Sequence, residues 1–159
     1  MSEIIRVKIA DLAVMKDDGL LITVGLGSCV GIALYDTVYR VAGLAHILLA
    51  DSAMFRNQDN LAKFADTAIP LLADEMARQG ARNGRLAAKI AGGSQLFSFE
   101  NSALSVGEKN IQMARQTLSK LKIPLLAEDV GGSTGRTMRV YVREGRVTVT
   151  TAGGEEREI

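Results

Sequence analysis

The only cysteine and the only histidine of this 159-residue chain are the side chains best suited to chemistry. Cys29 lies in TVGLGSCVGIALYD (residues 23–36), and His46 lies in GLAHILL (residues 43–49). A thiol becomes a strong nucleophile when it loses its proton, and a histidine within hydrogen-bond reach is the usual base. The pair predicts nucleophilic chemistry at an acyl group. Two such residues do not suffice for a structural zinc site, which needs four ligands.

Two expected hairpins would bring these residues together. If the segments that hold Cys29 and His46 form a hairpin that turns at 37–38, the two residues lie opposite each other. If the preceding strand folds back through 25–27, Thr23 also lies opposite Cys29. Thr23, Cys29 and His46 would then share one face of three adjacent strands. A slip of one residue in either hairpin would move a partner to the other face.

The glycines around Cys29 allow three interpretations. Gly25, Gly27 and Gly31 resemble a dinucleotide-binding fingerprint, but such a fingerprint needs a helix directly after it, and a strand-like segment follows here. Residues 27–31 also have the outline G-x-nucleophile-x-G, in which small residues expose backbone N–H groups that can hold an oxyanion. The third interpretation is structural, with a buried cysteine, a core histidine and a tight corner.

Composition narrows the class of protein. Lys and Arg total 19 and Asp and Glu total 18, so the net charge of +1 predicts no binding to nucleic acid. No apolar run approaches the roughly 18 residues that cross a bilayer. The first residues, MSEIIRVKIADL, lack the apolar stretch of a signal peptide. We expect a cytoplasmic protein that does not insert into membranes.

Periodicity predicts the elements that position Cys29 and His46. Apolar, β-branched segments indicate seven or eight strands, and the period changes to a helical one at about 59–80 and 107–121. This pattern predicts one α/β (α+β) domain over residues 1–152, with a mostly antiparallel or mixed sheet and two main helices. Residues 153–159 are expected to form a flexible tail. The strand-like segments are 4–15, 20–24, 29–36, 41–50, 85–93, 124–130, 137–144 and 146–151.

Five ordered blocks resemble CheD, the chemoreceptor glutamine deamidase family of bacterial and archaeal chemotaxis. The resemblance extends over nearly the whole chain and implies a sandwich similar to the deamidase domain of cytotoxic necrotizing factor. Two small departures are Ala50, where the family often has proline, and Ser94, where alanine is common. The blocks are TVGLGSCVGIALYD (23–36), GLAHILL (43–49), AAKIAGGSQLF (87–97), VGEKNI (106–111) and AEDVGGSTGR (127–136).

The resemblance implies a role for each candidate residue. Cys29 matches the family's nucleophile, His46 the histidine that keeps it as thiolate, and Thr23 the residue that orients the imidazole. Backbone N–H groups near Gly27 and Ser28 would hold the oxyanion. The resemblance implies no metal and no cofactor. It assigns no role to Arg136, which either supports the site or is solvated.

The substrate implied is a glutamine on the cytoplasmic helices of a methyl-accepting chemoreceptor. The thiolate would attack its side-chain amide, ammonia would leave, and water would hydrolyse the thioester to glutamate. The family also binds the chemotaxis phosphatase CheC. The alternative function is therefore an adaptor that controls this phosphatase and has little turnover of its own.

Overall fold

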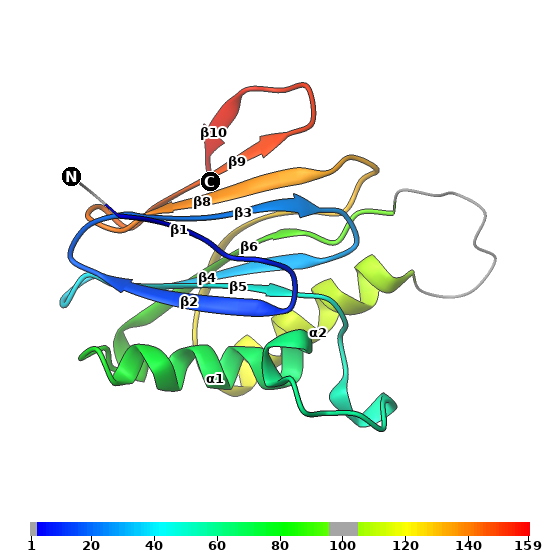
Figure 1. Ribbon diagram of the computed structural model, residues 1–159, viewed down its shortest axis with the longest axis horizontal. Helices are drawn as coiled ribbons and strands as arrows, with labels where there is room; N and C mark the ends of the chain where they lie inside the picture. Colours follow the sequence, from blue (N-terminus) through cyan, green and yellow to red (C-terminus); the bar gives the residue numbers. More distant parts are fainter. Residues whose placement is uncertain (1–2, 96–104) are drawn as a thin grey trace.

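The computed structural model describes residues 3–95 and 105–159. Within them, two five-stranded sheets stack on each other, and two helices cover the outer face of the second sheet (Figure 1). The first sheet has the order β1-β3-β8-β9-β10 and the second the order β2-β5-β4-β6-β7. Most neighbouring strands are antiparallel, but β1 and β3 are parallel, as are β6 and β7. The predicted α+β class with mixed sheets and two main helices is confirmed.

The chain moves between the two sheets several times. The first sheet consists of β1 (Ile4–Arg6), β3 (Leu20–Leu26), β8 (Arg136–Tyr141), β9 (Arg146–Thr151) and β10 (Glu156–Glu158). The second consists of β2 (Asp11–Lys16), β4 (Val30–Asp36), β5 (Val41–Ile47), β6 (Leu86–Gly92) and β7 (Leu125–Val130). The helices are α1 (Ala65–Ala77) and α2 (Val106–Lys120), with 3-10 turns at Ser52–Met54, Leu61–Lys63 and Asn83–Arg85.

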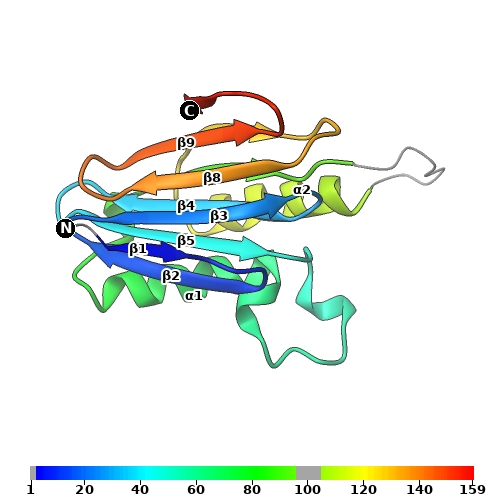
Figure 2. The ribbon, with the colours of Figure 1, turned by 45° about the horizontal axis from the view of Figure 1, so that its top comes forward.

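Strands β4 and β5 are buried along almost their whole length because they are covered on both faces. Val30, Ile32 and Leu34 belong to the core beneath the helices, whereas Ala33 and Leu44 belong to the core between the sheets. Strand β3 of the first sheet crosses over β4 and β5 (Figure 1; Figure 2). The space between the sheets is therefore lined by β3 on one side and by β4 and β5 on the other.

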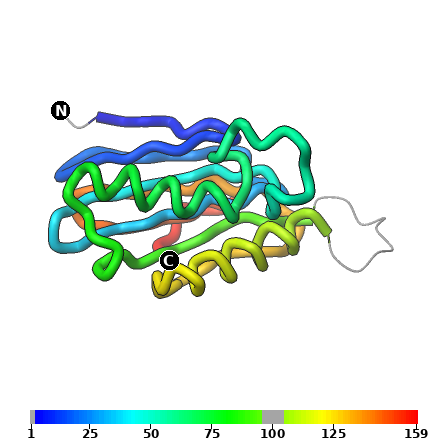
Figure 3. Tube along the Cα trace, turned by 90° about the horizontal axis from the view of Figure 1, so that it is seen from below, coloured from blue at the N-terminus to red at the C-terminus, as the bar shows by residue number. Residues whose placement is uncertain are grey.

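The two helices lie side by side across the outer face of the second sheet (Figure 3). Helix α2 begins after Ser105, whose hydroxyl accepts from the Glu108 N–H. Helix α1 begins later than expected, at Ala65. Asn60 caps the short 3-10 turn Leu61–Lys63 that precedes the helix, because its side chain accepts from the Ala62 N–H.

The C-terminal residues 153–159, for which the sequence predicts a flexible tail, instead contain β10. This strand pairs antiparallel with β9. The Ile159 N–H donates to the Val147 carbonyl, and the Lys89 ammonium donates to the Ile159 carbonyl. The charged composition of this segment does not predict these contacts, because they depend on the edge of a sheet formed earlier in the chain.

Candidate active site

Cys29 directly precedes β4, and both it and His46 of β5 border the space between the sheets, but they are not directly opposite each other. In the β4–β5 pair His46 is opposite Gly31, so the predicted register is wrong by two residues. The loop has four residues rather than two because the Asp36 carboxylate accepts from the N–H groups of Val38 and Tyr39. A two-residue shift preserves the face. Cys29 lies two residues before Gly31, so it is offset from His46 along the direction of β4.

Thr23 lies beside His46 but belongs to the first sheet. The predicted hairpin between the strand of Thr23 and that of Cys29 does not form, because β3 pairs with β1 and β8 and not with β4. Residues 27–29 carry the chain from one sheet to the other. Gly31 leaves room for this crossing, since a Cβ there would lie 2.8 Å from the Met138 sulfur and 3.6 Å from Thr23 Cγ2.

The Thr23 hydroxyl links His46 to a backbone carbonyl. Thr23 Oγ1 donates to the Val7 carbonyl at 2.6 Å and lies 2.7 Å from His46 Nδ1. A hydroxyl has one proton, and a carbonyl can only accept. The proton on Oγ1 therefore belongs to the bond with Val7, and Nδ1 must donate to Oγ1. This fixes the tautomer, so that Nε2 has a free lone pair.

His46 Nε2 is buried and has no hydrogen-bond partner in the described part of the chain. The Cys29 thiol, 6% exposed, therefore does not hydrogen-bond to it in this structure. Burial lowers the pKa of His46 to about 4. Burial also raises the pKa of the Cys29 thiol, an effect that the backbone N–H of Cys29 partly opposes. Both shifts favour a neutral thiol and a neutral imidazole over a resting ion pair.

Hydrogen bonds to all three of its carbonyl groups hold the segment Gly27–Cys29 in place. The Gly27 carbonyl accepts from the Ser94 N–H at 2.8 Å, and the Cys29 carbonyl accepts from the Gly93 N–H at 2.8 Å. Between them, the Ser28 carbonyl accepts from the side-chain amide of Asn110 at 2.9 Å. Sequence reasoning missed Asn110, although it lies in the VGEKNI block, because only the fold brings helix α2 to this segment.

The two predicted oxyanion residues differ in what their N–H groups do. The Gly27 N–H donates to the Gly25 carbonyl at 3.0 Å. The N–H groups of Ser28 and Cys29 donate to no other residue among those that the structure describes. Ser28 and Cys29 therefore offer free donors beside the thiol, whereas Gly27 would first have to break its turn.

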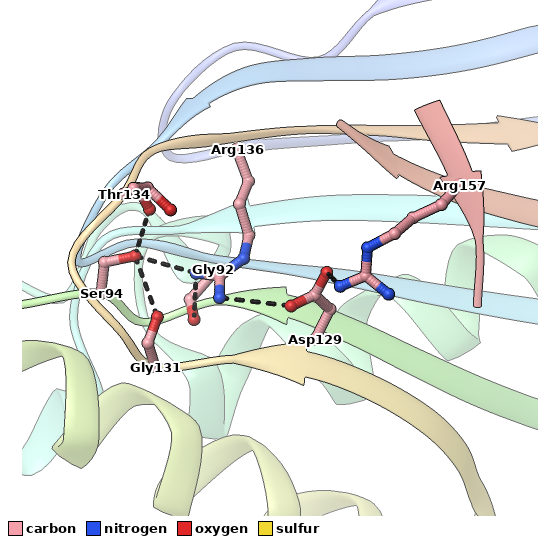
Figure 4. Close-up of polar contacts among 7 residues, drawn as sticks. All are labelled: Gly92, Ser94, Asp129, Gly131, Thr134, Arg136 and Arg157. Atoms are coloured by element: carbon pink, nitrogen blue, oxygen red, sulfur yellow. Dashed lines mark hydrogen bonds and ion pairs between the residues drawn. The ribbon is translucent and has the colours of Figure 1, made fainter. Parts of the chain in front are cut away.

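Arg136 is buried and not solvated, and its side chain lies between Ser94 and Asp129 (Figure 4). Its guanidinium donates to the Ser94 hydroxyl at 2.8 Å and pairs with Asp129 at 3.2 Å. Asp129 also pairs with Arg157 of β10, and the Ser94 hydroxyl donates to the Thr134 carbonyl at 2.6 Å. These contacts fix residue 94, whose N–H holds the Gly27 carbonyl.

Among residues 3–95 and 105–159, no group of three or more His, Cys, Asp or Glu side chains could hold a metal ion. No helix in the same residues is long and apolar enough to cross a membrane.

Comparisons with known proteins give a consistent set of relatives. A family model described as CheD chemotactic sensory transduction matches residues 48–151. The chain is 52% identical over 152 residues to a "Probable chemoreceptor glutamine deamidase CheD" of Moorella thermoacetica, covering 94% of this chain and 91% of that protein. It is 47% identical over 154 residues to a protein of the same name from Caldanaerobacter subterraneus, covering 96% and 95%.

Among solved structures, the chain is similar to the Bacillus licheniformis hypothetical protein YfiH. The TM-score is 0.44 at 17% sequence identity, and the match covers 69% of this chain and 46% of that one.

Proposed function

The chain belongs to the CheD family of chemotactic sensory transduction proteins, and we propose that it is a protein-glutamine deamidase that converts chemoreceptor glutamines to glutamate. The names of its relatives support the substrate, since they are called probable chemoreceptor glutamine deamidases. The observation that carries the chemistry is the buried, unpartnered Nε2 of His46, which borders the same space between the sheets as Cys29.

In the first half of the proposed reaction, Cys29 is the nucleophile and His46 the general base. Nε2 takes the thiol proton as the sulfur attacks the amide carbon, and the carbonyl oxygen becomes an oxyanion. The C–N bond then breaks, His46 returns the proton to the nitrogen, and ammonia leaves a thioester on Cys29. The neutral states of both groups suit this sequence better than the resting thiolate that the resemblance implies.

In the second half, water completes the exchange of amide for carboxyl. His46 takes a proton from water as the oxygen adds to the thioester carbon. The C–S bond breaks, the proton returns to the sulfur, and the side chain leaves as glutamate. The net reaction consumes one amide and one water and gives one carboxylic acid and one ammonia.

Thr23 acts as a positioning residue, because its hydroxyl holds the Nδ1 proton and leaves Nε2 basic. The distance between Cys29 and His46 must shorten when substrate binds. Hydrogen bonds between catalytic groups are often long in free enzymes and tighten in the complex. The N–H groups of Ser28 and Cys29 would receive the oxyanion.

The partners follow from the family. We propose that the substrate is a glutamine on the cytoplasmic helices of a chemoreceptor, which places the protein in the cytoplasm. Binding of the phosphatase CheC rests on the resemblance alone. Cys29→Ala separates the two functions, since it should abolish deamidation and leave phosphatase binding intact.

The test is mass spectrometry of a receptor cytoplasmic fragment incubated with the wild-type protein or with Cys29→Ala. We expect a deamidation mass shift at specific glutamines with the wild type only. If the wild type produces no shift but binds the phosphatase tightly, the protein is an adaptor and not an enzyme.

A further inference from the structure

Asn110 is a fully buried polar residue that contacts the segment carrying the nucleophile and is so far without a role. It lies in the second turn of α2, and its side chain is 0% exposed. The NH₂ group of its amide donates to two carbonyls, that of Ser28 at 2.9 Å and that of Leu48 at 3.1 Å. Because only the NH₂ group can donate to carbonyls, this orientation of the amide is the one that the contacts require.

Packing alone does not account for Asn110. Its Oδ1 atom is buried and has no hydrogen-bond partner in the described residues. A buried acceptor without a partner lowers stability. We would therefore expect an interior position that served packing alone to hold an apolar side chain. What the amide does provide is a fixed direction for the Ser28 carbonyl.

The direction of that carbonyl determines where the Cys29 N–H points. The peptide unit between Ser28 and Cys29 is planar and trans, so its C=O and N–H point in opposite directions. Asn110 holds the carbonyl on the side of α2. The N–H of Cys29 is thereby turned away from the helix, and it donates to no other residue among those described.

We infer that Asn110 is a positioning residue that orients the Cys29 N–H as a donor to the oxyanion. The biological meaning of this inference rests on the proposed function. The donor itself would serve any carbonyl that the Cys29 thiol attacks. The flanking carbonyls of Gly27 and Cys29 are held by Ser94 and Gly93. Preorganised donors of this kind lower the barrier because they need no reorientation during the reaction.

The test uses a reversible adduct that needs no turnover. The Cys29 sulfur adds to the carbonyl carbon of propionaldehyde, and the thiol proton moves to the oxygen, which occupies the oxyanion position. Iodoacetamide alkylates the same thiol by displacement of iodide and forms no oxyanion. Cys29 is the only cysteine, so the mass of the intact protein reports its alkylation. The concentration of propionaldehyde that halves the alkylation rate, the half-protecting concentration, measures the stability of the adduct.

We expect Asn110→Leu to raise this half-protecting concentration at least about tenfold, since removing an oxyanion donor costs about 100-fold or more in rate. The alkylation rate without aldehyde, and its dependence on pH, should stay within about twofold of wild type. Asn110→Ala, which also removes the amide donor, should behave alike and serves if the leucine variant does not fold. Asn83→Leu is the matched control, since Asn83 is exposed and donates to the Leu121 carbonyl at 3.0 Å.

An unchanged half-protecting concentration would overturn the inference, as would a parallel loss of plain alkylation, which would mean that Asn110 only shapes the loop. A wild-type thiol that reacts with neither reagent would overturn it too. With a receptor fragment as substrate, Asn110→Leu should lower kcat and leave KM unchanged. If the wild type deamidates nothing while the aldehyde result holds, the proposed function fails and the inference stands.

Discussion

The His46 imidazole is held across the gap between the two sheets, where its Nδ1 lies 2.7 Å from the Thr23 hydroxyl. The two residues come from β5 and β3, which are not neighbours in either sheet. The same hydroxyl donates to the Val7 carbonyl, so the contact assigns the Nδ1 proton to the imidazole. The basic nitrogen of His46 is therefore set by the stacking of the sheets and not by strand pairing.

Thr23→Val should impair deamidation by about 100-fold, since it removes the acceptor that fixes the His46 tautomer. Thr23→Ser keeps the hydroxyl and should recover most of the activity. His46 is the only histidine, so ¹⁵N NMR of the imidazole follows a single ring. The spectrum should show protonated Nδ1 in wild type and Thr23→Ser, and a mixture of tautomers in Thr23→Val. Equal spectra in all three proteins would contradict the role of Thr23.

The stability of the protein should fall on mild acidification because of His46. The unfolded chain takes up the imidazole proton near pH 6.5, whereas the folded protein takes it up only near pH 4. The free energy of unfolding should therefore decrease as pH falls through this window, by up to about 3 kcal/mol. Urea unfolding at pH 7 and pH 4.5 measures the change. His46→Gln should lack this part of the loss, and an identical loss in that variant would assign it to other groups.

The protonation state of Cys29 distinguishes general-base catalysis from a resting ion pair. Because burial raises the pKa of this thiol, its alkylation by iodoacetamide should rise with pH through a midpoint above the ordinary value of about 9. A rate that is already constant between pH 6 and 8 would instead indicate a thiolate stabilised by protonated His46. Cys29→Ala provides the background rate.

The sequence predicts the strands around the site well because their apolar segments are long and bounded by polar turns. It predicts that Cys29 and His46 point to the same side, because this depends only on even spacing, and both residues do border the space between the sheets. It does not predict that Thr23 comes from another sheet, because alternation within a strand carries no information on which sheet the strand joins. Asn110 and Val7 could not be found, since their contacts join segments far apart in the chain.

Gly92→Ala should destabilise the site without removing a functional group. Gly92 has a φ of +111°, and a Cβ there would lie 2.3 Å from the Cys29 carbonyl oxygen. Either β6 or the Cys29 segment must move, and we expect a loss of about 2 kcal/mol or more in the free energy of unfolding together with reduced activity. Gly84→Ala is the control, because a Cβ at Gly84 meets nothing within 4 Å. Equal stability of the two variants would contradict the close approach at Gly92.

The variant Arg136→Met tests whether the buried ion pair of Arg136 with Asp129 supports the segment Gly27–Cys29. Arg136→Met removes the donor to Ser94 and one of the two arginines that pair with Asp129. Removing one partner of a buried pair costs about 3–5 kcal/mol. The remaining contact of Asp129 with the exposed Arg157 should reduce this loss to about 2–3 kcal/mol.

The matched control for Arg136→Met is Arg115→Met, which breaks the half-exposed pair of Arg115 with Glu128. This change should cost less than about 1 kcal/mol, because solvent screens such pairs. Chemical denaturation of both variants measures the difference, and deamidation at a temperature where both remain folded measures the effect on the site. A lower kcat for Arg136→Met alone would mean that the network positions residue 94, whose N–H holds the Gly27 carbonyl. Equal kcat values would mean that the network stabilises the fold and leaves the nucleophile segment unchanged.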